Sequence, residues 1–360
     1  MDNRAPSRLT RRSMLAGAAA VAAVAPVVVA STAGSTATAA AGRTRRVTIY
    51  AEALPGGMFG YGLAPGQATI PGPLLEIYEG DTLEIELVNS TSERLSIHPH
   101  GVNYDTNSDG SPLNNSFNQP GETRTYVWRT QTQYRTGSGF YMPGSAGYWH
   151  YHDHALGTDH GTVGIAKGLY GGLIVRKAGD LLPDRQHTIV FNEMTINNKV
   201  APDTPMLEAR HGERVEFVCI GHGNLPHTFH LHAHRWADTR TGMLRGDNDH
   251  SPVIDNKNLD PGSSFGFQVL AGEAVGPGAW MYHCHVQSHS DPMSGIFLVR
   301  NADGSMPAGA QESIDRFHGH NHGATLVNPT GDPTESTSVD PSVQPPAPAT
   351  PPAPGAHSGH

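Results

Sequence analysis

A short segment around residue 284 gathers side chains that bind metals. It reads His283-Cys284-His285, and His289 and Met293 follow within nine residues of the cysteine. Thiolate, imidazole and thioether ligands in combination favour copper in an electron-transfer site. The alternative is a buried free cysteine among surface histidines, which is the common state of a lone cysteine. The density of candidate ligands favours the metal site.

The same segment predicts two metal sites. The residues from Trp280 to Val286 have the composition of a β-strand, on which successive side chains point to opposite faces. His283 and His285 then share one face, and Cys284 lies on the other. One site therefore contains the thiolate, a second lies on the opposite face, and adjacent residues join the two.

An internal repeat multiplies these histidines. A strand-like segment starts at Gly80 and another at Gly212, and each is followed after 18 residues by a His-x-His pair. A second pair follows 54 residues later in the first copy and 53 residues later in the second. The four pairs are His98 and His100, His152 and His154, His230 and His232, and His283 and His285. One such pair is a weak signal, but four at matching spacings predict a shared metal cluster.

The two copies differ at the thiolate site. The second copy carries His227, Cys284 and His289. At the equivalent positions the first copy has, in order, Leu95, Asp153 and Thr158. The first copy is therefore expected to keep its share of the histidine cluster and to lack the thiolate site.

Composition predicts an all-β protein. Charged residues make up 16% of the 360 residues, and the chain has 42 glycines and 28 prolines. Such a chain is rich in turns and long enough for two domains. The formal net charge is −9, so the basic footprint of a nucleic-acid-binding protein is absent. The second cysteine, Cys219, lies in an apolar run and is expected to be a buried apolar residue, with a disulfide to Cys284 as the alternative.

Both ends of the chain are predicted to lie outside the fold. Residues 1–41 combine Arg11-Arg12 with an Ala/Val-rich run over 16–30 and small residues over 39–41, which is typical of a twin-arginine-type export signal. The mature protein is expected to be secreted into the extracellular space, without a membrane-spanning segment. Residues 304–360 are rich in histidine and proline and are predicted to be a disordered tail.

In these motifs the sequence resembles the multicopper oxidases, and within them the two-domain bacterial laccases, or small laccases, over roughly residues 43–305. The resemblance implies two cupredoxin-like Greek-key β-sandwich domains, 42–177 and 178–303, of which the second carries a type 1 copper. It implies four coppers per subunit, namely one type 1, one type 2 and two type 3. It also implies a homotrimer with the trinuclear cluster at the subunit interfaces.

The resemblance assigns ligands position by position. The type 1 ligands are His227, Cys284, His289 and Met293. The type 2 ligands are His98 and His230. The type 3 ligands are His100, His152, His154, His232, His283 and His285. Met293 follows Cys284 by nine residues, one fewer than is usual in the family, so an axial ligand and an ordinary core residue both remain open.

The activity that the resemblance implies is that of a laccase, a benzenediol:oxygen oxidoreductase. Phenols or other small reducing substrates would give single electrons to the type 1 copper through His289, and dioxygen would be reduced to water at the cluster. The alternatives are a metal-ion (cuprous) oxidase, a copper nitrite reductase, and a copper electron-transfer or binding protein. The scattered methionines disfavour the first alternative, and the four His-x-His pairs disfavour the other two.

Two residues after the first histidine pair are candidates for catalytic roles. Asp109 matches an acidic residue that the family places near the cluster, and Tyr104 matches a tyrosine to which a redox role has been assigned. The alternatives are a turn aspartate before Gly110 and a buried aromatic residue. Surface or hydrogen-bonded roles are expected for His150, His160, His187, His211, His222, His234 and His250.

Overall fold

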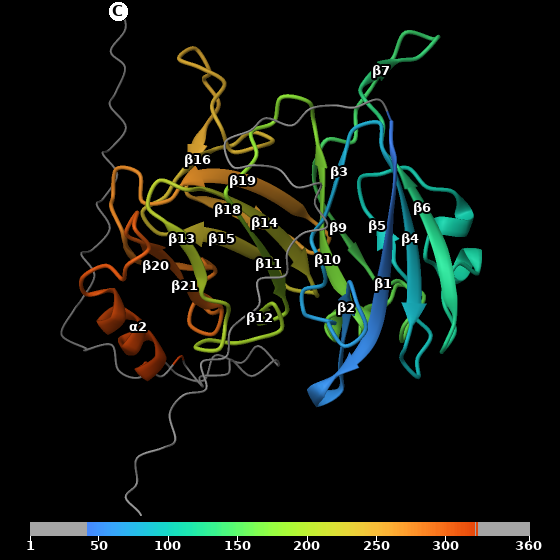
Figure 1. Ribbon diagram of the computed structural model, residues 1–360, viewed down its shortest axis with the longest axis horizontal. Coiled ribbons are helices and arrows are strands. Elements are labelled where there is room, and N and C mark those ends of the chain that lie inside the picture. The colour runs from blue at the N-terminus through green and yellow to red at the C-terminus, as the bar shows by residue number, and fades with distance from the viewer. Residues whose placement is uncertain (1–41, 321, 323–360) are drawn as a thin grey trace, which may run out of the picture. The chain divides into compact units, whose positions relative to one another are not determined.

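The computed structural model describes residues 42–320 and residue 322. The described residues up to His320 belong to one compact unit built mainly from β-strands (Figure 1). The predicted export signal over 1–41 and most of the predicted tail lie outside the described residues. Among the described residues, no helix is long and apolar enough to cross a membrane.

The N-terminal half, strands β1 to β10, is a sandwich of two four-stranded sheets with the strand orders β2-β1-β4-β6 and β3-β10-β9-β5. The strands of the two sheets are β1 (Thr44–Leu54), β2 (Met58–Gly62), β3 (Leu75–Tyr78), β4 (Thr82–Asn89), β5 (His98–Pro99), β6 (Thr123–Arg129), β9 (Gly147–His152) and β10 (Tyr170–Arg176). As the sequence pattern predicts, β4 alternates, and its buried residues Leu83, Ile85 and Leu87 pack with Trp128 in the core between the sheets.

The C-terminal half, strands β11 to β21, repeats this arrangement with the strand orders β12-β11-β14-β19 and β13-β21-β20-β15-β18. Its strands are β11 (Arg185–Asn192), β12 (Thr195–Ile196), β13 (Leu207–Arg210), β14 (Arg214–His222), β15 (His227–Leu231), β18 (Asn256–Leu259), β19 (Ser264–Leu270), β20 (Gly278–Cys284) and β21 (Ser294–Arg300). The parallel pair β1 and β4 corresponds to β11 and β14, and β3 with β10 corresponds to β13 with β21. The internal repeat is thus a repeat of topology, and the all-β sandwich prediction is confirmed.

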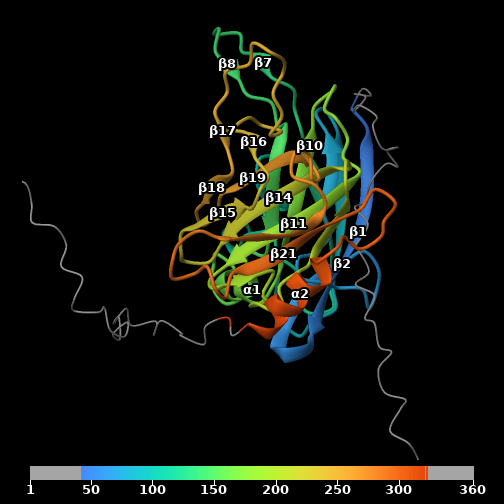
Figure 2. The same ribbon diagram turned by 90° about the vertical axis from the view of Figure 1, so that its left-hand side faces the viewer.

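Shorter elements complete the fold. They are the 3-10 helices η1 (Pro55–Gly57), η2 (Thr106–Ser108) and η3 (Pro112–Asn114), the helices α1 (Thr162–Ala166) and α2 (Ala310–Gly319), and the strand pairs β7 (Tyr134–Arg135) with β8 (Tyr141–Met142) and β16 (Trp236–Ala237) with β17 (Val253–Ile254). Figure 2 shows both strand pairs extending from the same end of the sandwiches, away from α1 and α2.

A buried contact joins the two halves. The Arg176 guanidinium on β10 donates to Glu216 on β14 at 2.6 Å and to Glu76 on β3 at 2.8 Å, and all three side chains are almost fully buried. An apolar cluster beside it contains Tyr148 and Ile174 of the N-terminal half and Val218 of the C-terminal half. The predicted domain boundary at 177/178 falls between the strands of the two halves and stays a prediction.

The prediction of a disordered tail from residue 304 is wrong for its first part. Helix α2 buries Ala310, Ile314 and Phe317 against Ile296 and Leu298 of β21. Figure 1 shows α2 on the side of the C-terminal half, below the labels of β20 and β21. These three positions follow the spacing i, i+4, i+7, which places them on one face of a helix. The stripe is short and lies in a polar, Pro-rich segment, so composition conceals it.

Candidate metal centre

The predicted thiolate site is assembled in the C-terminal half. His227 begins β15, Cys284 ends β20, and His289 lies in the turn after β20. The Sγ atom of Cys284 lies 3.6 Å from Nδ1 of His227 and 3.7 Å from Nδ1 of His289, and the two nitrogens are 3.3 Å apart. Antiparallel pairing of β15 with β20 brings the first two residues together although 57 residues separate them. The three ligand atoms form a compact triangle.

The donor set of this triangle fits copper. All three side chains are buried, with 1% of His227, 0% of Cys284 and 8% of His289 exposed. Burial raises the pKa of the Cys284 thiol and lowers the pKa of His227 to about 4. A metal cation relieves this cost for the thiol, because a coordinating thiol loses its proton. Two imidazoles and a thiolate in a trigonal set are typical of blue-copper sites.

Met293 lies next to the triangle despite the shortened loop. Its side chain is fully buried in the same core cluster as Cys284. The backbone N–H of Cys284 donates to the carbonyl of Met293 at 2.9 Å, and the N–H of Met293 donates to the carbonyl of His289 at 3.0 Å. The turn therefore keeps Met293 beside the thiolate, and its role as axial ligand stays a prediction.

The N-terminal half gathers a first group of histidines, here called the N-terminal quartet: His98, His100, His152 and His154. His98 on β5 is paired in register with His152 on β9. Nε2 of His100 lies 3.0 Å from Nε2 of His152, and the rings of His98 and His154 are 4.8 Å apart. The predicted ligands of this half therefore converge on one place.

The C-terminal half repeats the arrangement in the C-terminal quartet: His230, His232, His283 and His285. His230 on β15 is paired in register with His283 on β20. Nε2 of His232 lies 3.1 Å from Nε2 of His283, and the rings of His230 and His285 are 5.3 Å apart. His283 thus belongs to the quartet while its neighbour Cys284 belongs to the thiolate triangle, as strand alternation predicts.

Backbone carbonyls orient half of these rings. In four histidines Nδ1 faces a carbonyl oxygen: His98 faces Asp109 at 2.5 Å, His152 faces Asp153 at 2.7 Å, His230 faces Asp255 at 2.8 Å and His283 faces Cys284 at 2.8 Å. Nδ1 must carry the proton in each, because a carbonyl only accepts. The Nε2 lone pair of these four rings is then free for a metal, and the carbonyl fixes both tautomer and ring orientation, as outer partners of metal-binding histidines do. Sequence spacing gave no sign of these carbonyl partners.

The two quartets remain separate within one chain. Among the residues that the structure describes, candidate ligand groups draw on the N-terminal quartet through His98, His100 and His152, or on the C-terminal quartet through His230, His232 and His283, and no group mixes them. His285, at the edge of the C-terminal quartet, is exposed. Each quartet therefore offers part of a metal cluster.

Asp109 and Tyr104 both adjoin the N-terminal quartet. Oδ1 of Asp109 lies 3.6 Å from Nδ1 of His98, and the Tyr104 ring meets the His98 ring edge-on at 5.6 Å. Burial raises the pKa of Asp109, but hydrogen bonds from Ser111 and Asn114, together with the nearby histidines of the quartet, leave that pKa below its ordinary value. Asp109 is thus an ionised neighbour of the quartet, and its catalytic role stays a prediction.

Two further histidines lie against the N-terminal quartet, and sequence reasoning did not place them there. His150 and His222 are 1% and 4% exposed, so of the surface or hydrogen-bonded roles expected for them the surface role is wrong for both. The hydrogen-bonded role holds for His150, whose Nδ1 lies 3.3 Å from Oγ of Ser264. Burial lowers the pKa of His150 well below its ordinary value and that of His222 to about 3. The sequence did contain one indication of this position: His150 lies two residues before His152, and residues two apart on a β-strand point to the same face.

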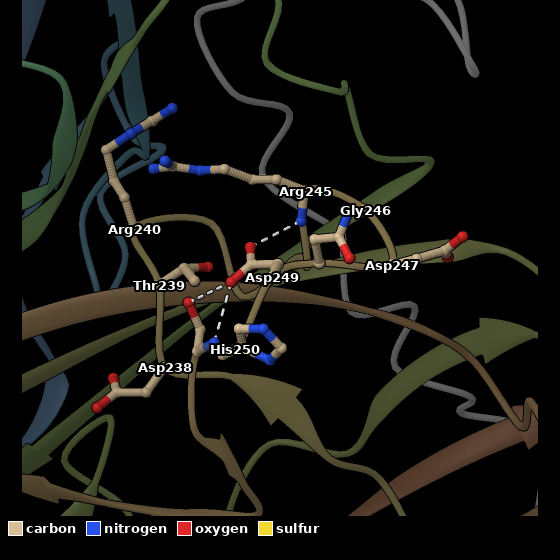
Figure 3. Close-up of a pocket in the computed structure, with 10 residues that line it drawn as sticks. Asp238, Thr239, Arg240, Arg245, Gly246, Asp247, Asp249 and His250 are labelled. Carbon is tan, nitrogen blue, oxygen red and sulfur yellow. Dashed lines mark hydrogen bonds between the residues drawn. The ribbon is translucent and has the colours of Figure 1, made fainter.

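The surface pocket in Figure 3 is formed by residues other than these ligands. It is formed by the loop between β16 and β17, where Asp249 accepts hydrogen bonds from the backbone of Arg245 and from Ser251 (Figure 3). Its lining contains none of the predicted metal ligands.

Comparison with known proteins agrees with the site. Multicopper oxidase families match residues 66–180 and 180–303. A probable nitrite reductase-hydroxylamine oxidoreductase fusion protein of Kuenenia stuttgartiensis is 32% identical over 278 residues, which cover 69% of this chain and 30% of that protein. The ferroxidase HEPHL1 of Mus musculus is 27% identical over 294 residues, covering 66% of this chain and 23% of that protein. The chain thus spans less than a third of the length of these relatives.

Solved structures share the fold. A multicopper oxidase crystal structure superposes with a TM-score of 0.52 at 26% identity, over 75% of this chain and 94% of that one. The copper nitrite reductase of Nitrosomonas europaea has a TM-score of 0.54 at 20% identity, over 71% and 94% of the two chains, and this likeness concerns the fold alone. Fold, family matches and ligand geometry agree: the chain belongs to the multicopper oxidase family, and copper is the metal that its donor sets fit.

Proposed function

We propose that the protein oxidises small donors one electron at a time at the thiolate site and reduces dioxygen to water at a histidine cluster. The observation that carries the proposal is the placement of His283 and Cys284, which are adjacent on β20 yet belong to different ligand groups. Two sites joined by one peptide bond suit electron transfer between them. When bound, four coppers per subunit, of types 1, 2 and 3, would supply the one-electron redox chemistry and the site of oxygen reduction.

The protein's own residues support this division of labour. Burial of the triangle keeps water and substrate away from the thiolate, so a donor must give its electron through a ligand. His289 is the candidate, because it lies in a turn and is 8% exposed where His227 is 1% exposed. Electron entry of this kind requires contact between the donor and His289 more than a shaped pocket. It therefore suits phenols and similar small donors, the substrates expected of a two-domain laccase.

A ferroxidase or other metal-ion oxidase is the second candidate, because ferroxidases are among the relatives. Rates with 2,6-dimethoxyphenol, Fe²⁺ and Cu⁺ as the donor distinguish the two. The laccase proposal predicts the highest kcat/KM with the phenol. A kcat/KM for either metal ion that is more than about 10-fold higher would assign the protein to metal-ion oxidation.

A second copy of the chain would complete the cluster. The N-terminal quartet of one subunit and the C-terminal quartet of the next can meet in a closed head-to-tail ring. The resemblance to two-domain laccases implies that this ring is a homotrimer. Separation of the quartets within one chain and the exposure of His285 support this proposal. The predicted export signal over 1–41 would place the assembled protein outside the cell.

Mixed rings test the shared cluster. One chain carries His98→Ala and His100→Ala, the other carries His230→Ala and His232→Ala, and both keep Cys284. Each variant alone is expected to be inactive, since every interface lacks two of its eight histidine ligands. A ring purified through two different tags pairs one intact N-terminal quartet with one intact C-terminal quartet, so about one third of the wild-type oxygen consumption should return. A mixed ring as inactive as its parents would contradict the proposal.

Asp109→Asn tests the predicted proton role. The backbone carbonyl that faces His98 is retained, so copper content should not change. Loss of the carboxylate is expected to lower turnover about 10²-fold, as for removal of a general acid–base group. Asp105→Asn, a change at an exposed position in the same loop, serves as the control. Unchanged turnover of fully loaded Asp109→Asn would assign the residue to the turn alone.

A further inference from the structure

His150 and His222 link the two halves of the chain next to the N-terminal quartet. His150 lies on β9 of the N-terminal half, and His222 ends β14 of the C-terminal half. Their rings meet edge-to-face at 5.1 Å. Nδ1 of His150 also lies 3.3 Å from Oγ of Ser264 on β19, so the contact between the halves includes a hydrogen bond.

Both rings touch predicted ligands. The His150 ring stacks on His100 with a centroid distance of 3.9 Å and an angle of 26° between the ring planes. The His222 ring meets the His152 ring edge-on at 5.5 Å. These contacts restrict rotation of His100 and His152, the two histidines whose Nε2 atoms face each other at 3.0 Å.

Hydrogen bonding defines the free nitrogen of His150. The Ser264 hydroxyl lies 2.9 Å from the carbonyl of Tyr148 and donates to it, so the hydroxyl oxygen accepts from Nδ1–H of His150. Nε2 of His150 is therefore a bare lone pair. This atom is buried and has no hydrogen-bond partner among the described residues, and the same holds for Nε2 of His222.

Packing alone does not account for two such side chains. A buried polar atom without a partner destabilises the fold, and an apolar side chain of similar size would fill the same space without that cost. A nearby cation changes the balance, because an unpaired nitrogen lone pair lowers the energy of positive charge in a buried site. Both rings lie against the N-terminal quartet, so a metal ion bound there would be the nearby cation.

We propose that His150 and His222 are positioning residues that hold His100 and His152 and stabilise the charge of the cluster, at the expense of the stability of the metal-free protein. The inference rests on the proposed role of the N-terminal quartet as ligands. What it adds is that the C-terminal half of the chain, through His222, also supports the N-terminal quartet.

Apolar replacements test the inference in the full-length protein. His150→Phe and His222→Phe keep a ring, and His150→Leu and His222→Leu provide smaller side chains in case the phenyl ring disturbs the stack. His187→Phe is the control, because His187 has its Nε2 bonded to the carbonyl of Glu208 and packs against Phe217 and Phe297, away from both quartets.

Three measurements are made on each variant. Cu²⁺ is added to metal-free protein, and the copper retained is measured after dialysis against a graded series of chelator concentrations. The thiolate-to-copper charge-transfer absorption of the Cys284 site serves as an internal reference. The urea midpoint of the metal-free protein reports its stability.

The apolar variants are expected to retain cluster copper about 10- to 100-fold less tightly, the effect of losing an outer-shell partner, with the Cys284 absorption unchanged. Their metal-free urea midpoints should equal or exceed that of the wild type, and His187→Phe should retain copper normally. Unchanged copper retention in all four variants would overturn the inference. The inference would also be overturned if each variant lost copper retention in proportion to a fall in its urea midpoint, because that result would indicate an effect on packing alone. Wild-type protein that binds copper only at the thiolate site would instead overturn the proposed function.

Discussion

Cys284→Ser is expected to abolish donor oxidation and the thiolate-to-copper absorption while both histidine quartets keep their ligands. Serine does not ionise at neutral pH and offers a hard oxygen in place of the soft thiolate that copper favours. In the proposed function the thiolate site and the histidine cluster work as one unit, so oxygen consumption with a phenol donor should fall by more than about 10³-fold. Copper analysis should show loss of the thiolate-site copper with retention of cluster copper.

The second cysteine provides the control for this prediction. Cys219 is fully buried in the C-terminal core, and burial raises the pKa of its thiol well above the ordinary value. Cys219→Ala should lower the free energy of unfolding by about 1 kcal/mol and leave absorption and oxygen consumption unchanged. Substantial phenol oxidation by Cys284→Ser would show that electrons enter the cluster by another route.

Arg176→Met is expected to lower the free energy of unfolding by about 3–5 kcal/mol, the usual cost of breaking a buried ion pair by removing one partner. The guanidinium is the cation between Glu76 and Glu216, which are 4% and 0% exposed at their side chains. Without it, two carboxylates remain buried near each other. Urea unfolding of the metal-free protein, followed by fluorescence and circular dichroism, measures the effect.

Two further variants define the cause. Arg185→Met removes an ion pair with Glu213 whose side chains are 40% and 23% exposed, so its effect should stay below about 1 kcal/mol. Adding Glu76→Gln and Glu216→Gln to Arg176→Met should restore part of the lost stability, because neutral amides remove the uncompensated charge. A loss below about 1 kcal/mol for Arg176→Met would mean that this network does not hold the halves together.

The sequence predicted the parts of the site that follow from local periodicity. Strand alternation placed His283 and Cys284 on opposite faces, and the structure assigns them to different ligand groups. The repeat likewise predicted that His98 and His230 would lie in equivalent surroundings. Both inferences needed only the period of a β-strand and the spacing between copies.

What the sequence did not predict depends on contacts between distant segments. His222 reaches His150 across the boundary between the halves, and Arg176 meets Glu216 of the other half over 40 residues of separation. No spacing rule reports such contacts, because they arise from how two sandwiches pack. Helix α2 was missed for a different reason: three buried residues in a polar segment are too few to outweigh its composition.

The most direct test of the account is oxygen uptake by copper-loaded wild-type protein supplied with 2,6-dimethoxyphenol, with hydrogen peroxide assayed in the same vessel. The account predicts that one dioxygen is consumed for every four electrons that the phenol gives, without release of peroxide. That ratio follows from reduction of dioxygen to two waters. Fully loaded protein that consumes no oxygen, or that releases peroxide in proportion to the oxygen consumed, would contradict it.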